Sequence, residues 1–209
     1  MDNQNAEFRR HSRRLFSVLR AIVRRGADGP SSKQDFAARL EGRIGALSRV
    51  HAMIMRSPQD GVDLEELLHG ELLAQAIPAQ RYRASGPDTR IAGEAPLPLA
   101  LALHEIAVNA VIHGALLGEG GTLDVSWDRV THDGGEWLRL VWQESAVGRL
   151  APAPAGKGFG LELIENMLPY ELDAGTRITW KEPGLRIEME IPAVHLFNSW
   201  THGERAAQS

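Results

Sequence analysis

The hydrophobic pattern of the chain is strongest between Leu97 and Leu116, where the sequence reads LPLALALHEIAVNAVIHGAL. Apolar residues cover most of a helical circumference in this stretch, which predicts a buried helix of about five turns. A glutamate and an asparagine are among the polar residues that interrupt it. Glu105 and Asn109 are four positions apart and therefore lie one above the other on a single face of the helix. We expect the rest of the fold to be built around this helix.

Two amphipathic helices are predicted ahead of this stretch, within residues 8–22 and 36–54. Glycines and Pro30 separate the two helices, and Pro58 ends the second one. A helical hairpin of this size cannot bury a core alone. We therefore expect residues 1–58 to form a dimerisation hairpin that pairs with a second copy into a four-helix bundle.

The pattern after residue 62 alternates between helical and strand periods, which predicts an α/β sandwich with one mixed sheet covered by helices on one face. We expect this module to span residues 62–195, followed by a loosely ordered polar tail at 196–209. The expected helices are 63–75, 97–116 and 159–170, and the expected strands are 81–84, 89–92, 123–127, 138–144, 176–181 and 185–191.

Composition narrows the class of protein. The 209 residues are 43% hydrophobic and 24% charged, as in an ordinary soluble globular protein. Cysteine is absent, which excludes disulfides, thiolate metal sites and a cysteine nucleophile. No apolar run is long enough to cross a bilayer and no signal peptide is visible, so we expect a cytoplasmic chain without a membrane segment.

The net charge of -4 conceals an asymmetry, because residues 1–57 carry +7 and the remainder carries -11. A basic front joined to an acidic back supports two modules. The basic front also raises the possibility of a nucleic-acid binder. Its basic residues encircle the helix, however, and aromatic residues make up only 6% of the chain, so we expect no nucleic-acid partner.

The paired polar residues of the central helix are the first candidate for chemistry. A buried carboxylate and amide need partners, because an unpaired polar group in a core is costly. A hydrated Mg²⁺ that carries nucleotide phosphates would satisfy both Glu105 and Asn109, since Mg²⁺ prefers oxygen ligands and keeps its waters. The alternative is that both side chains only bond to neighbouring backbone.

A glycine-rich segment, GKGFG, is the second candidate, and it follows an Ala- and Pro-rich loop. Its glycines let backbone N–H groups approach an anion, and its lysine adds a cation. A flexible hinge is the alternative. The strand before the loop ends in Glu144, whose carboxylate could accept a hydrogen bond from the amine of adenine. The residues of the segment are Gly156, Lys157, Gly158 and Gly160.

The order of these elements resembles the nucleotide-binding domain of the GHKL (Bergerat) class, shared by histidine kinases, type II topoisomerases, one class of heat-shock chaperones and mismatch-repair ATPases. More narrowly, the chain is similar to the HWE family of sensor histidine kinases. Its markers are a His in the Asn-bearing helix, here His104, and a Trp-x-Glu strand end, here Trp142-Gln143-Glu144. The resemblance runs from about Glu7 to Pro192 and includes FAARLEGRIGALSRVHAMI and GKGFGLELIE.

This resemblance implies a protein-histidine kinase of a two-component system that uses ATP and Mg²⁺. By that resemblance, His11 accepts the phosphoryl group and a response-regulator aspartate then receives it. Glu105 is the general base or orienter, Asn109 ligates Mg²⁺, and Glu144 reads adenine. The residues assigned to the rest of the nucleotide site are Gly156, Lys157, Gly158, Gly160, His104 and Trp142.

The chain differs from the family pattern at three positions. Leu15 stands where the family has Asn, Ile112 where it has Lys, and Ala146 where it has the first Gly of a Glu-x-Gly-Gly-Pro sequence. These changes support an alternative function, a catalytically weakened histidine phosphotransferase or scaffold with a degenerate ATP site. His51, on the second hairpin helix, is interpreted as a packing residue.

Overall fold

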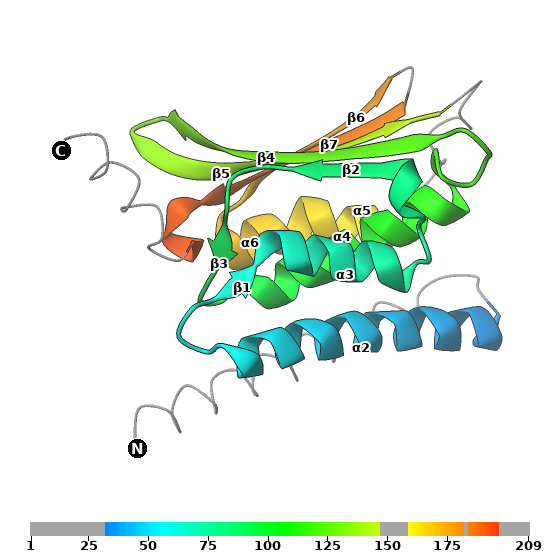
Figure 1. The fold of residues 1–209 in the computed structure, drawn as a ribbon, viewed down its shortest axis with the longest axis horizontal. Helices are drawn as coiled ribbons and strands as arrows, with labels where there is room; N and C mark the ends of the chain where they lie inside the picture. The colour runs from blue at the N-terminus through cyan, green and yellow to red at the C-terminus, as the bar shows by residue number, and fades with distance from the viewer. Residues whose placement is uncertain (1–31, 147–158, 182–183, 197–209) are drawn as a thin grey trace.

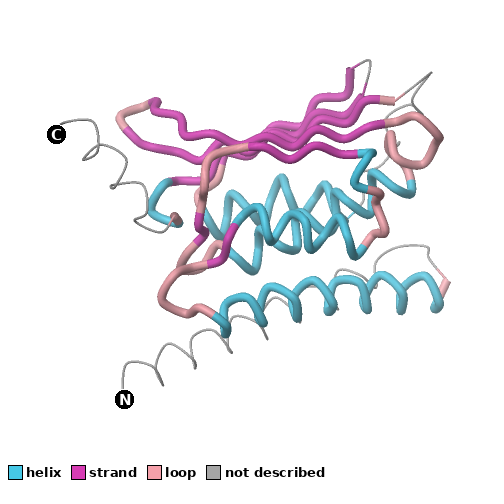
Figure 2. Tube along the Cα trace, viewed as in Figure 1, coloured by secondary structure: helices cyan, strands magenta, loops and turns pink. Residues whose placement is uncertain are grey.

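The computed structural model describes residues 32–146, 159–181 and 184–196. These residues form three layers, a sheet, a middle layer of helices beneath it, and one long helix on the outer side of that middle layer (Figures 1 and 2). The predicted helix-covered mixed sheet is confirmed.

The main sheet has the order β2-β4-β5-β7-β6. Its first pair, β2 with β4, is parallel, and the remaining pairs are antiparallel. A separate two-stranded ladder joins β1 to β3. The strands are β1 (Val62–Asp63), β2 (Tyr82–Ser85), β3 (Arg90–Ile91), β4 (Thr122–His132), β5 (Gly135–Ser145), β6 (Gly175–Lys181) and β7 (Gly184–Pro192).

Strand register places one candidate site residue, Glu144, on the buried face of the sheet. In β4, Leu123 and Val125 are buried while the intervening Asp124 is exposed, as alternation predicts. Leu123 pairs with Glu144 of β5, and Val125 pairs with Trp142. Glu144 therefore lies among apolar residues, on the side of the sheet that the helices cover.

The middle layer contains α3 (Leu64–Ala74), α4 (Pro96–Ile112), α5 (Phe159–Glu162) and α6 (Leu168–Leu172). Helix α4 is the predicted central helix and is buried along most of its length. It ends at Ile112 rather than Leu116, because the chain turns at Gly114 and the Ala115 N–H bonds to Glu144 instead of a helical carbonyl. The predicted helix 159–170 is present, with a π-helical turn at Leu163–Met167 between α5 and α6.

The outer helix, α2 (Lys33–Arg56), is the predicted second hairpin helix. It begins at a capping box in which Ser32 and Asp35 exchange hydrogen bonds. Its apolar side packs against α4, and Leu47 and Val50 belong to the same hydrophobic core as the middle helices. The apolar side of α2 therefore has a partner within the chain, and its burial does not by itself require the second copy that the sequence analysis expected.

The predicted first hairpin helix lies outside the described residues, and dimerisation remains a prediction. The tail was expected to be loosely ordered from residue 196, and this is wrong for Leu196. Ala193–His195 forms a 3-10 turn, and Leu196 is buried and forms a β-bridge with Ile91. No helix in the described ranges is long and apolar enough to cross a membrane.

Candidate functional site

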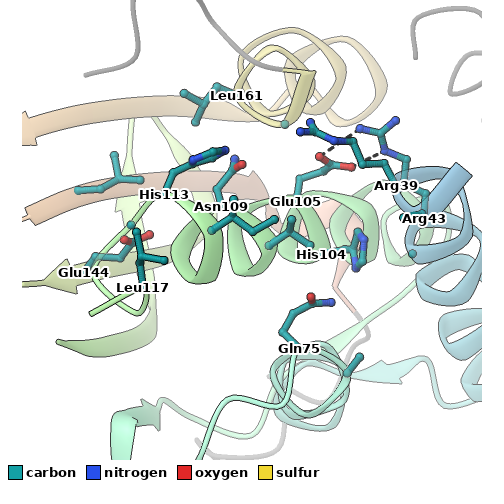
Figure 3. A pocket seen from close by; sticks show the side chains of 18 of the residues that line it. Arg39, Arg43, Gln75, His104, Glu105, Asn109, His113, Leu117, Glu144 and Leu161 are labelled. Atoms are coloured by element: carbon teal, nitrogen blue, oxygen red, sulfur yellow. Dashed lines mark hydrogen bonds and ion pairs between the residues drawn. The ribbon is translucent and has the colours of Figure 1, made fainter. Parts of the chain in front are cut away.

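A cavity of about 630 Å³ lies between α2, α4, the start of α5 and the ends of β5, β6 and β7 (Figure 3). Its volume falls in the range of small-molecule pockets, roughly 300–1,000 Å³. The residues that line it are Ala38, Arg39, Gly42, Arg43, Ala74, Gln75, His104, Glu105, Val108, Asn109, Ile112, His113, Gly114, Leu117, Glu144, Gly160, Leu161, Trp180 and Leu185.

The polar groups of the cavity are arranged along its length. Glu144 lies at one end, Asn109 and Glu105 follow along α4, and the arginines of α2 lie at the other end (Figure 3). The structure therefore brings together most of the described residues that the sequence assigned to the site. Gly156, Lys157, Gly158 and His11 lie outside the described residues.

Glu105 forms a buried ion pair with a residue that the sequence analysis did not select. Arg43 donates from Nε to Oε1 of Glu105 at 2.6 Å and from Nη2 to Oε2 at 3.3 Å. Both side chains are almost fully buried. The signal was present in the sequence, because Arg43 occupies a core position in the apolar stripe that includes Leu40 and Leu47.

Asn109 lies one turn further along α4 and is half-buried at the cavity wall. Gly160, at the start of α5, packs closely against it. A Cβ placed on Gly160 would lie 2.9 Å from Nδ2 of Asn109 and 3.0 Å from Cβ of Glu105. The last glycine of the predicted segment thus brings α5 into contact with Asn109 and Glu105, and a larger residue would push the two helices apart.

Glu144 is fully buried and its carboxylate has protein donors. Oε2 accepts from the Ala115 N–H at 2.9 Å, and Oε1 accepts from Nε1 of Trp142 at 3.1 Å. Burial raises the pKa of Glu144 above its ordinary value, and the two hydrogen bonds oppose that shift. Gly114 fits against Oε2 of Glu144 without room for a Cβ.

Trp142 is not among the residues that line the cavity. Residues i and i+2 of a strand share a face, so its indole reaches the carboxylate of Glu144 from within the core. Direct contact of Trp142 with a nucleotide therefore stays a prediction. Its place in the structure is that of a support for Glu144.

His104 lines the cavity, but its Nδ1 faces α3 rather than Glu105 or Asn109. Its Nδ1 lies 3.2 Å from Oε2 of Glu71 in α3, and Arg49 of α2 binds the same carboxylate at 2.6 Å. A Cβ on Gly42 would lie 2.9 Å from Nε2 of His104. His104 therefore ties α2, α3 and α4 together, a role that the sequence analysis did not identify.

The loop after α4 is held by Arg81, which precedes β2. Its guanidinium donates to the carbonyl oxygens of Gly118 at 2.6 Å, Gly121 at 2.8 Å and Leu116 at 3.2 Å. This loop carries the Ala115 N–H that binds Glu144. Arg81 thus supports the Glu144 end of the cavity from outside.

Among the residues that the structure describes, no group of three or more His, Asp or Glu side chains could hold a metal ion by itself. The side-chain oxygens of Asn109 and Glu105 are the candidate metal ligands in the cavity, and those of Glu105 face Arg43. This donor set suits Mg²⁺ that is held by one or two side chains together with phosphate oxygens.

Comparisons with known proteins agree with the geometry. The family model of the HWE histidine kinases matches residues 10–88. The chain is 36% identical over 186 residues to a blue-light-activated histidine kinase of Rhizobium johnstonii. The aligned region covers 87% of this chain and 51% of that protein. The chain is 33% identical over 193 residues to blue-light-activated histidine kinase 1 of Erythrobacter litoralis, covering 90% of this chain and 52% of that protein. The chain thus spans about half the length of these relatives.

The fold also has a solved counterpart. The histidine kinase domain of the Erythrobacter litoralis EL346 blue-light activated histidine kinase superposes with a TM-score of 0.55 and 14% identity, covering 92% of this chain and 94% of that one. This likeness concerns the fold. Family match and sequence identity, taken together with the His104 and Trp142-x-Glu144 markers, show that the chain belongs to the HWE histidine kinase family.

Proposed function

We propose that the chain is an ATP-dependent protein-histidine kinase that phosphorylates its own His11. The observation that carries the proposal is the cavity in which Glu144, Asn109 and Glu105 follow one another along one wall. Adenine would bind at the Glu144 end, and the phosphates would extend along α4 towards Glu105. Mg²⁺ would be held by the side-chain oxygen of Asn109 and by phosphate oxygens, and it would neutralise charge on the phosphates.

Glu144 suits the recognition of adenine because each carboxylate oxygen has two lone pairs. In the described part of the chain, one donor reaches each oxygen, the Ala115 N–H or the Trp142 indole. Capacity therefore remains to accept a hydrogen bond from the exocyclic amine of adenine. The same two donors fix the carboxylate, so recognition of the base requires little further ordering.

In the transfer step, a ring nitrogen of His11 attacks the γ-phosphorus, the bond from that phosphorus to the β,γ-bridging oxygen breaks, and ADP leaves. Positioning and charge stabilisation supply most of the catalysis for such a transfer. Glu105 orients the imidazole or receives its proton. Because both oxygens of Glu105 face Arg43, a role as base requires that ion pair to open.

The product would be a phosphohistidine that passes its phosphoryl group to an aspartate of a response regulator. A second candidate function, histidine phosphotransfer without autophosphorylation, is supported by Ile112. It lines the cavity as an apolar side chain at the position where the resemblance predicts Lys. Both candidates use His11, and they differ in whether ATP supplies the phosphate.

The test is incubation of the purified chain with Mg²⁺ and γ-labelled ATP, with Asn109→Ala as the comparison. A kinase yields an acid-labile, base-stable label on the wild-type chain, and Asn109→Ala loses both the label and Mg²⁺-dependent nucleotide binding. A wild-type chain that binds no ATP in a calorimetric titration would refute the kinase. If such a chain still accepts phosphate from a phosphorylated regulator, the second candidate is supported.

A further inference from the structure

The cavity does not end at α4, the helix that carries Glu105 and Asn109. It continues past Glu105 to α2, where Arg39, Gly42 and Arg43 line it. In Figure 3, both arginines extend from α2, which lies on the side of Glu105 opposite Glu144. A nucleotide whose base lies at Glu144 and whose phosphates follow α4 would therefore bring its terminal phosphate towards α2.

The position of α2 at this wall is held by several contacts. Arg43 binds Glu105, and Arg49 binds the buried carboxylate of Glu71 at 2.6 Å. Gly42 allows the helix to approach His104, whose Nε2 would lie 2.9 Å from an added Cβ. Arg39 lies one turn before Arg43 on the same helix, so its backbone is held at the rim of the cavity.

Arg39 differs from Arg43 and His104, the other basic side chains that line the cavity near α2. Arg43 is bound to Glu105, and His104 lies beside Glu71. Arg39 is exposed at the rim, and no acidic side chain in the described ranges forms an ion pair with it. A guanidinium without an acidic partner at the phosphate end of a pocket is suited to bind a phosphate through two parallel hydrogen bonds.

We propose that α2 completes the nucleotide site and that Arg39 binds the terminal phosphate of ATP. This inference rests on the proposed function, since it needs a nucleotide in the cavity. It adds a contact from the helix of the phosphotransfer segment, outside the α/β module. Because ADP lacks the γ-phosphate, Arg39 would help the site to distinguish ATP from ADP and would make the position of α2 sensitive to the bound nucleotide.

The experiment compares the affinities of the full chain for a non-hydrolysable ATP analogue and for ADP, both with Mg²⁺, by isothermal titration. Arg39→Gln removes an exposed guanidinium, and we expect it to weaken binding of the ATP analogue about tenfold or more while ADP affinity changes little. Arg39→Lys should restore part of the loss. The control is Arg56→Gln, which removes the same charge from the far end of α2, where Arg56 pairs with the exposed Glu66.

Unchanged affinity of Arg39→Gln for the ATP analogue would overturn the inference while leaving the kinase proposal intact. Equal losses for ATP analogue and ADP would also overturn it, because the contact would then not be with the terminal phosphate. A loss of the same size in Arg56→Gln would show that only the overall charge of α2 matters and would likewise overturn it. A wild-type chain that binds neither nucleotide refutes the proposed function itself, and this inference with it.

Discussion

Arg43 and Glu105 are 62 residues apart in the sequence, yet two hydrogen bonds join their side chains in a buried ion pair at the cavity wall. One residue belongs to the helix predicted to lie in a separate hairpin module, and the other to the central helix of the α/β module. The pair therefore links the predicted hairpin segment to the α/β module. It also lies where the proposed transfer chemistry takes place.

The first prediction concerns the stability of that link. Arg43→Ala leaves the carboxylate of Glu105 buried without its partner, so we expect the free energy of unfolding to fall by about 3–5 kcal/mol. The double variant Arg43→Met with Glu105→Leu replaces both charges by apolar groups and should recover most of the loss. Urea unfolding of the single and double variants measures both values. Additive losses in the double variant would show that the two side chains do not depend on each other.

The second prediction concerns Gly160. An added methyl group would press on Nδ2 of Asn109 at 2.9 Å and on Cβ of Glu105 at 3.0 Å. We expect Gly160→Ala to lower the free energy of unfolding by about 1–3 kcal/mol. We also expect it to weaken ATP binding by about tenfold, or about 1.4 kcal/mol, because it displaces the proposed Mg²⁺ ligand.

Gly118→Ala is the matched control, since a Cβ there meets no heavy atom within 4 Å. Thermal unfolding and nucleotide titration of both variants would provide the comparison. Wild-type nucleotide affinity in Gly160→Ala would mean that Asn109 need not hold its observed position in order to bind nucleotide.

The third prediction concerns pH. Burial raises the pKa of Glu144 above the ordinary value of 4.5, so the folded chain holds the proton of Glu144 at pH values where the unfolded chain has released it. The contribution of this group to stability is therefore fully present below pH 4.5 and is lost as pH rises through the folded-state pKa. Glu144→Gln does not titrate and lacks this loss.

The measurement is urea unfolding of the wild type and Glu144→Gln at a series of pH values from about 4.5 to 8. The amide breaks one of the two hydrogen bonds at every pH, because it cannot accept from both donors through oxygen. That penalty is constant, so the informative quantity is the slope of the stability difference between the two proteins against pH. The stability difference should shift in favour of the variant as pH rises, and a difference independent of pH would contradict the assignment.

Local periodicity accounts for the parts of this fold that the sequence predicted well. The central helix and the alternating strand of Leu123 and Val125 each depend on neighbouring residues, so both were predictable. The stacking of Glu105 and Asn109 follows from helical spacing alone. The hydrogen bond from Trp142 to Glu144 was open to the same reasoning, because residues two apart in a strand share a face.

Tertiary contacts explain what the sequence did not predict. An amphipathic helix shows which side is buried but not what buries it, so the packing of α2 on α4 could not be distinguished from pairing with a second copy. The partner of His104 is Glu71, 33 residues earlier on α3, and no short-range pattern connects them. Helix α4 ended early because Glu144, from a distant strand, takes the N–H of Ala115.

The most direct test of the kinase is the site of labelling by γ-labelled ATP in the wild type, His11→Gln and His51→Gln. Glutamine keeps the size and polarity of the side chain but has no imidazole nitrogen to phosphorylate. His51 is half-buried on α2 and serves as the control histidine. We expect label on the wild type and His51→Gln and none on His11→Gln, with equal ATP affinity in all three. Label that persists in His11→Gln, or is lost from His51→Gln instead, would contradict the assignment.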